Sequence, residues 1–127
     1  IQMYNLLYSS KLTFNKHTDQ AWGCVGNMRM FEATATGSFV LCENVPTLSK
    51  IFRNEEHIVT YCDTTEAVEK AQYYLKNEME REFIAKQGME HVLAHHIYSD
   101  RIEKVYDIVF GEGSEWQKLS QQELKQP

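Results

Sequence analysis

The sequence predicts an α/β fold in which a small parallel sheet is flanked by helices. Three β-prone stretches are separated by helical stretches, and further helical stretches follow the last strand. Strands that alternate with helices are joined by right-handed crossovers, which make the sheet parallel. The chain has 127 residues, enough for one domain with a modest core.

The expected elements follow one another with short connections. They are a short helix, a strand, a loop with two glycines, a helix, a strand, a short helix, a strand and three longer helices. In that order they occupy residues 3–10, 11–15, 16–26, 27–37, 38–43, 44–52, 57–63, 64–77, 78–96 and 97–111. Residues 1–110 are expected to form the folded domain, and 111–127 a polar tail.

The helix over residues 27–37 has clear signals at both ends. Asn27 is a good N-cap, and Gly37 can end the helix in a left-handed conformation. Met28, Phe31 and Ala35 recur at helical spacing and are predicted to form its buried stripe. The strand that follows, residues 38–43, is a short apolar run of the kind that is buried on both faces of a sheet.

Composition excludes several classes of protein. The net charge is −5 and the pI about 5.5, so the chain has no basic surplus for a nucleic-acid partner. No apolar run reaches the roughly 18 residues of a transmembrane helix. The chain begins at Ile1 without a signal-peptide pattern, so we expect a cytoplasmic protein.

The cysteines and histidines favour no metal site. Cys24, Cys42 and Cys62 are odd in number and match no paired metal motif, so reduced, small apolar side chains are the better interpretation. His91 and His95 share a helix face and could form half of a metal site, but no third ligand is evident. We therefore expect no metal and no cofactor.

A ligand site is expected at the carboxyl ends of the strands, where parallel α/β sheets bind ligands. The loop at 22–27, the first helical turn near Asn27, and Glu43 just after its strand should line this edge. Glu32 could accept two hydrogen bonds from a diol such as a ribose, although the pattern alone favours a glutamate that is solvated or pairs with the helix dipole. Arg29 is in the first turn, where a cation opposes the helix dipole, so it should have a phosphate or a carboxylate such as Glu43 as its partner.

Several motifs together resemble a known family. An Asn-x-Arg-x-Phe-Glu helix precedes small residues, a glycine and an apolar strand, and a Tyr-Tyr-Leu helix and a His-x-Tyr-x-x-Arg helix follow. The residues are Asn27, Arg29, Phe31, Glu32, Gly37, Tyr73, Tyr74, Leu75, His96, Tyr98 and Arg101. In order and spacing, nearly the whole chain up to about residue 110 resembles the C-terminal segment of GT-B glycosyltransferases, especially the spore-maturation-type group.

The resemblance implies a Rossmann-like, C-terminal part of a domain that binds a nucleotide-sugar donor. It implies that Glu32 binds the ribose and that the loop from Gly23 to Gly26 lies near the diphosphate or the sugar. Many family members have a glutamate eight positions before Glu32, where this chain has Cys24. The site residues expected from the resemblance are Gly23, Cys24, Val25, Gly26, Asn27, Arg29 and Glu32.

The resemblance also sets expectations about partners. The basic residues that neutralise the diphosphate and the acceptor-binding N-terminal domain would come from chain upstream of these residues, so this chain alone should be inactive. A sheet that lacks its neighbouring strands has an exposed edge, so a homodimer or exchanged elements are expected. The alternative is a non-catalytic nucleotide-binding or protein-interaction module.

Overall fold

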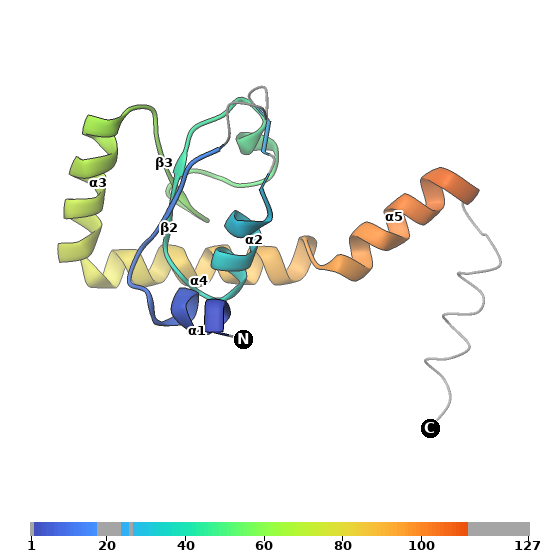
Figure 1. Cartoon of the computed structure of the whole chain (residues 1–127), viewed down its shortest axis with the longest axis horizontal. Helices are drawn as coiled ribbons and strands as arrows, with labels where there is room; N and C mark the ends of the chain where they lie inside the picture. The colour runs from blue at the N-terminus through green and yellow to red at the C-terminus, as the bar shows by residue number, and fades with distance from the viewer. Residues whose placement is uncertain (1, 18–23, 26, 112–127) are drawn as a thin grey trace. The chain divides into compact units, whose positions relative to one another are not determined.

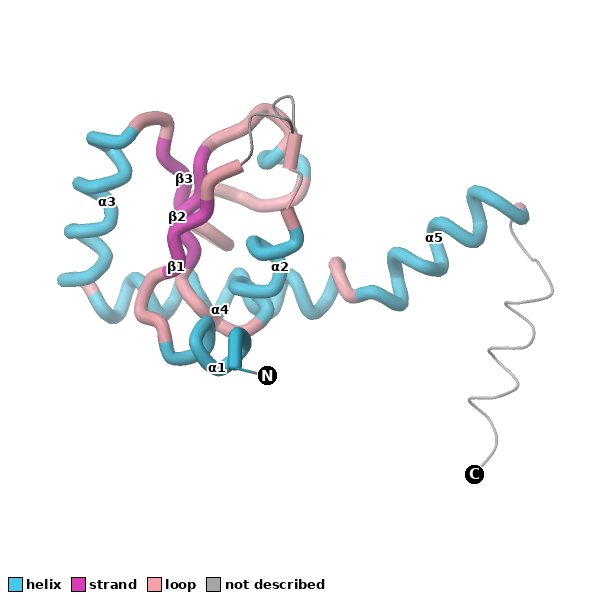
Figure 2. The backbone as a smooth tube through the Cα atoms, in the orientation of Figure 1, coloured by secondary structure: helices cyan, strands magenta, loops and turns pink. Residues whose placement is uncertain are grey.

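The computed structural model describes residues 2–17, 24, 25 and 27–111. Within them, three parallel strands, β1 (Thr13–Asn15), β2 (Val40–Glu43) and β3 (Val59–Tyr61), form one sheet in the order β1-β2-β3 (Figure 2). The predicted fold class, a Rossmann-like parallel sheet flanked by helices, is confirmed. The strands are shorter than the β-prone stretches of the sequence. β1 and β2 begin two residues later than their stretches and end where the stretches end, and β3 is shorter by two residues at each end.

The chain divides into two compact units, residues 1–94 and residues 95–127. The first contains the sheet, and its helices are α1 (Gln2–Ser9), α2 (Met28–Ala35), the 3-10 helix η2 (Leu48–Lys50), α3 (Thr64–Lys76) and nearly all of α4 (Glu78–His95). The second contains α5 (Tyr98–Phe110), which has no buried residue. The sheet, and with it the carboxyl edge where the ligand site is expected, belongs to the first unit.

The helices cover both faces of the sheet (Figure 1). β2 shows this most clearly, because its successive side chains join different cores. Val40 and Cys42 pack with α2 residues such as Met30, whereas Leu41 packs with α3 residues such as Tyr74. Helix α4 supplies buried residues to both cores. The prediction of a central strand buried on both faces is confirmed.

Helix α2 has the predicted ends but a different buried face. The Oδ1 atom of Asn27 accepts a hydrogen bond from Met30 N at 3.3 Å, and Gly37 has a φ of +79°. The buried residues are Met30, Ala33 and Thr34, whereas Met28 is 52% exposed.

The predicted stripe of Met28, Phe31 and Ala35 was therefore wrong at Met28, and it missed the residues that are fully buried. Phe31 and Ala35 are partly buried and pack against the core. The buried residues Met30 and Thr34 have the same helical spacing as Phe31 and Ala35, one position earlier in the sequence. Periodicity alone cannot show which of two such neighbouring apolar stripes is buried.

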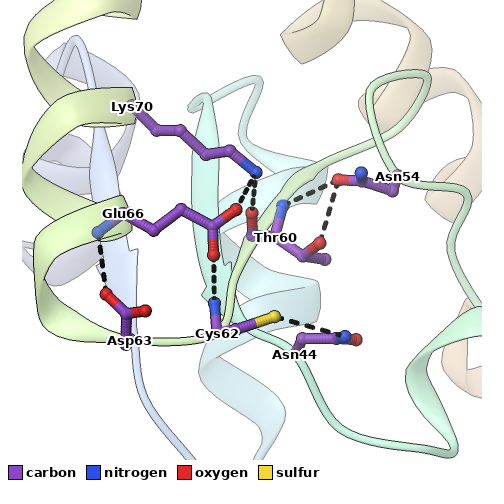
Figure 3. Close-up of polar contacts among 7 residues, drawn as sticks. All are labelled: Asn44, Asn54, Thr60, Cys62, Asp63, Glu66 and Lys70. Atoms are coloured by element: carbon purple, nitrogen blue, oxygen red, sulfur yellow. Dashed lines mark hydrogen bonds and ion pairs between the residues drawn. The ribbon is translucent and has the colours of Figure 1, made fainter.

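The free edge of β3 is occupied by side chains (Figure 3). Thr60 N donates to Asn54 Oδ1 at 2.8 Å, and Thr60 O accepts from Lys70 Nζ at 2.7 Å. Cys62 N donates to Glu66 Oε2 at 2.7 Å, and the other oxygen of Glu66 pairs with Lys70, also at 2.7 Å. Charged side chains that bond the outer backbone groups of an edge strand prevent another strand from pairing there. The sheet is therefore closed at β3.

Candidate functional site

The three strands bring a polar cluster to their carboxyl ends. Asn15 is paired with Cys42, and Glu43 with Tyr61, in the register of the sheet. Asn15 Nδ2 donates to Cys42 Sγ at 3.2 Å, and the Tyr61 hydroxyl donates to Asn15 O at 3.1 Å. This cluster therefore spans the sheet at the edge where parallel α/β folds bind ligands.

His17 extends the cluster just beyond β1. Its backbone N donates to Glu43 Oε2 at 3.0 Å, and its ring Nε2 lies 3.4 Å from Cys42 Sγ. The residue is 5% exposed. Burial lowers the pKa of His17, and the Glu43 carboxylate opposes this only in part, so the ring is neutral at pH 7.

Burial also keeps the other titratable groups of the cluster protonated. It raises the pKa of Cys42 to about 11 and that of Tyr61 to about 12, in both cases with a further contribution from Glu43. Cys42 is therefore a thiol at pH 7, and the thiolate needed for nucleophilic attack is scarce. Cys42 and Tyr61 therefore offer hydrogen bonds to a ligand, and Cys42 is not a thiolate nucleophile.

The start of α2 lies against this edge. Asn27 Nδ2 donates to Lys16 O at 3.3 Å, which ties the helix cap to the residue after β1. Val25 N donates to Thr47 Oγ1 at 2.8 Å, which fixes the chain just before the helix. Backbone N–H groups of a first helical turn attract anions. The arrangement thus puts the N-terminus of α2 next to the polar cluster.

Glu32 has protein partners for both of its oxygens. Oε1 accepts from the hydroxyl of Tyr4 in α1 at 3.2 Å, and Oε2 lies 3.4 Å from Arg29 Nε. The Glu32 side chain is 23% exposed and that of Arg29 is 55% exposed. A ligand can therefore reach the carboxylate, but it has to share or replace these contacts.

Arg29 pairs with Glu32, one turn away, whereas the carboxylate suggested from the sequence was Glu43. Glu43 is bonded to the backbone of His17 instead. The pair of Arg29 with Glu32 is local in the helix, and such pairs form at a spacing of three residues without help from the rest of the fold.

The remaining expected site residues are only partly described. Gly23 and Gly26 lie outside the described residues. Cys24 is exposed and has a free thiol, and Val25 is partly buried against the core. The structure brings Asn27 and Glu43 to the carboxyl edge through their contacts with Lys16 and His17.

Four members of the cluster were missed as site residues by the sequence analysis: Asn15, Cys42, Tyr61 and His17. Tyr61 is the last residue of β3, and His17 is two residues after the end of β1. A search for polar residues at the ends of all three strands would have found both, because those ends meet at one edge.

The histidines considered for metal binding have other contacts. The ring of His91 lies over that of His57, with centroids 4.0 Å apart, and its Nε2 is 2.8 Å from Ile51 O. Among the described residues, no group of three or more His, Cys, Asp or Glu side chains is arranged to hold a metal ion. No described helix is both long and apolar enough to cross a membrane.

Comparison with known proteins gives one match. A sequence model of the family described as "Glycosyl transferase-like" matches residues 1–107. No curated protein and no solved structure matches the chain. The match covers the three strands, helices α1 to α4 and most of α5, and it agrees with the parallel sheet described above. This chain belongs to the glycosyltransferase-like family.

Proposed function

We propose that this chain binds the nucleotide-sugar donor of a glycosyltransferase that transfers the sugar to an acceptor. The observation that carries the proposal is the juxtaposition of the α2 N-terminus with a polar cluster at the carboxyl edge of a parallel sheet, in a member of a glycosyltransferase-like family. A nucleotide sugar has a diphosphate for the helix end and hydroxyl groups for the polar side chains.

In this proposal Glu32 binds the ribose, and the start of α2 binds the diphosphate. The carboxylate of Glu32 is held between Tyr4 and Arg29, which restricts its rotamers before the donor arrives. A ribose hydroxyl would take the place of the Tyr4 hydroxyl as hydrogen-bond donor. Asn27 and the backbone from Gly23 to Gly26 would lie nearer the diphosphate, with Cys24 and Val25 in the same loop.

The chemical role follows from charge. Glycosyl transfer releases a nucleoside diphosphate, so negative charge develops on the leaving group and must be stabilised. The α2 N-terminus supplies part of this stabilisation through the helix dipole. We assign the remaining positive charge, and the acceptor site, to other parts of the full-length protein, which we place in the cytoplasm.

The decisive test is Glu32→Gln in the full-length protein. The change keeps the size of the side chain but weakens charge-assisted hydrogen bonds worth about 1.5–3 kcal/mol each, so donor affinity should fall by at least about tenfold. Isothermal titration calorimetry with a panel of nucleotide sugars measures the affinity, and thermal unfolding should stay close to wild type. Glu90→Gln, on α4, is the matched control and should bind normally.

A second variant separates binding from structural support. Tyr4→Phe removes the hydroxyl that competes with the ribose, so donor affinity should be unchanged or slightly higher. If Glu32→Gln binds the donor with wild-type affinity, Glu32 does not bind the ribose. If Tyr4→Phe and Glu32→Gln in addition lose the same free energy of unfolding, Glu32 only links α1 to α2. Binding of the donor without turnover in the full-length protein would favour the non-catalytic module.

The sheet edges suggest where a partner would bind. β3 is closed by Asn54, Lys70 and Glu66, so an additional strand has to pair with β1, whose central residue Phe14 is 55% exposed. A chain with one open edge can self-associate only in pairs. We therefore expect residues 1–127 on their own to form a homodimer through β1, and sedimentation showing a monomer at high concentration would contradict this.

A further inference from the structure

His17 has a buried ring nitrogen that the fold does not use. Among the described residues, its Nδ1 is the one buried side-chain nitrogen or oxygen atom without a hydrogen-bond partner. Buried polar atoms are nearly always paired, and leaving one unpaired costs about 1–3 kcal/mol. Such an atom beside a ligand edge is therefore a candidate contact for the ligand.

The surroundings of the ring show which way Nδ1 is directed. The other nitrogen, Nε2, faces Cys42 Sγ, and Cys42 in turn contacts Met30 of α2. The two nitrogens of an imidazole point away from each other, so Nδ1 is directed away from this sulfur pair. The backbone holds the residue in place, because His17 N is bonded to Glu43 and the preceding carbonyl to Asn27.

We propose that His17 Nδ1 forms a hydrogen bond with a hydroxyl group of the sugar that the donor carries, an assignment that rests on the proposed function. In that function Glu32 binds the ribose and the α2 N-terminus the diphosphate. The residue before His17, Lys16, accepts a hydrogen bond through its carbonyl from the helix cap Asn27. Asn27 is five residues before Glu32 in the sequence. His17 thus lies where the donor continues beyond the diphosphate.

The protonation state favours a hydroxyl over a phosphate oxygen. Burial keeps the ring neutral, so His17 offers a diphosphate no positive charge. A neutral ring has one N–H and one acceptor nitrogen, and the contact with Cys42 is compatible with either tautomer. A hydroxyl can donate to Nδ1 or accept from it, whereas a phosphate oxygen can only accept. The atoms that cover Nδ1 have to shift for the sugar to reach it.

The two amide variants of His17 separate its two nitrogens. His17→Gln retains a polar group near the position of Nε2 and has none at Nδ1, whereas His17→Asn retains one near Nδ1. Calorimetry on the full-length protein would compare hexose derivatives of UDP, GDP and dTDP with the corresponding free nucleoside diphosphates. We expect His17→Gln to weaken binding of the nucleotide sugar about threefold to tenfold, with little effect on the free nucleotide. His17→Asn should retain more of the preference for the nucleotide sugar.

Each outcome has a definite meaning. If wild type binds a nucleotide sugar and both variants keep its full preference over the free nucleotide, the role of His17 is overturned and the proposed function stands. If wild type binds the free nucleotide equally well, the contact with the sugar is likewise overturned. If wild type binds none of these compounds, the proposed function fails and the inference fails with it.

A measurement on the wild-type protein covers the case in which a variant does not fold. Nitrogen NMR of the His17 ring should show a shift of Nδ1 when the nucleotide sugar is added and a much smaller one with the free nucleotide. Equal shifts with both compounds, or none with either, would refute the contact.

Discussion

Gly88 in α4 should be among the positions least tolerant of a side chain. A Cβ at this position would lie 2.1 Å from His57 O and 2.9 Å from Thr34 Cγ2. The first distance is far below van der Waals contact and involves backbone, which cannot swing aside as a side chain can. Gly88 therefore permits α4 to pack directly against α2 and against the segment before β3.

The size of the effect follows from two opposing contributions. Gly88→Ala gains about 1 kcal/mol of helix propensity. Overpacking costs typically about 1–3 kcal/mol and occasionally more, and the contact with a carbonyl oxygen puts this site at the upper end of that range. We expect a net loss of about 2 kcal/mol in the free energy of unfolding, or a fall of roughly 8–16 °C in Tm.

Urea and thermal unfolding followed by circular dichroism would measure this loss. Lys86→Ala, an exposed substitution in the same helix, is the control and should change stability by no more than about 0.5 kcal/mol. Wild-type or higher stability of Gly88→Ala would refute the close approach of α4 to His57.

Three further predictions concern stability and association. Gly37→Ala should cost about 1 kcal/mol, because Gly37 has a φ of +79° while its Cβ would only touch Met89, and Gly37→Asn should cost less. Burial lowers the pKa of His57 in the folded chain, so the unfolded chain binds more protons as the pH falls through 6.5, the ordinary pKa of histidine. The free energy of unfolding should therefore decrease as the pH falls below 6.5. The urea midpoint should decrease less steeply with falling pH in His57→Gln than in wild type. Asn54→Ala should uncover Thr60 N at the β3 edge, so sedimentation should show assemblies larger than a dimer.

The features that the sequence predicted well depend on neighbouring residues. Asn27 was identified as an N-cap and Gly37 as a left-handed helix end, because each is a local choice of side chain and backbone. The alternation of strands and helices gave the parallel sheet for a similar reason. Helical periodicity was less decisive for α2, where it gave Met28 as buried and missed Met30.

The features that were missed depend on residues far apart in the chain. His17 contacts Cys42 across 25 positions, and Tyr61 contacts Asn15 across 46. No local pattern indicates which residues of separate strands meet, and a lone histidine in a loop gives no signal of its burial. The partner of Arg29 is the exception, because Glu32 is only three residues away in the same helix, whereas the carboxylate suggested from the sequence was Glu43.

The register of the sheet therefore controls the geometry of the candidate site. Asn15 meets Cys42, and Glu43 meets Tyr61, as paired residues of adjacent strands. A slip of one residue between two strands would send each of these side chains to the opposite face. It would also separate Asn15 Nδ2 from Cys42 Sγ and remove the partner of the buried Asn15 amide, at a cost of about 1–3 kcal/mol. The polar cluster thus selects the register that assembles it, and the same contacts that stabilise the sheet position His17 beside the start of α2.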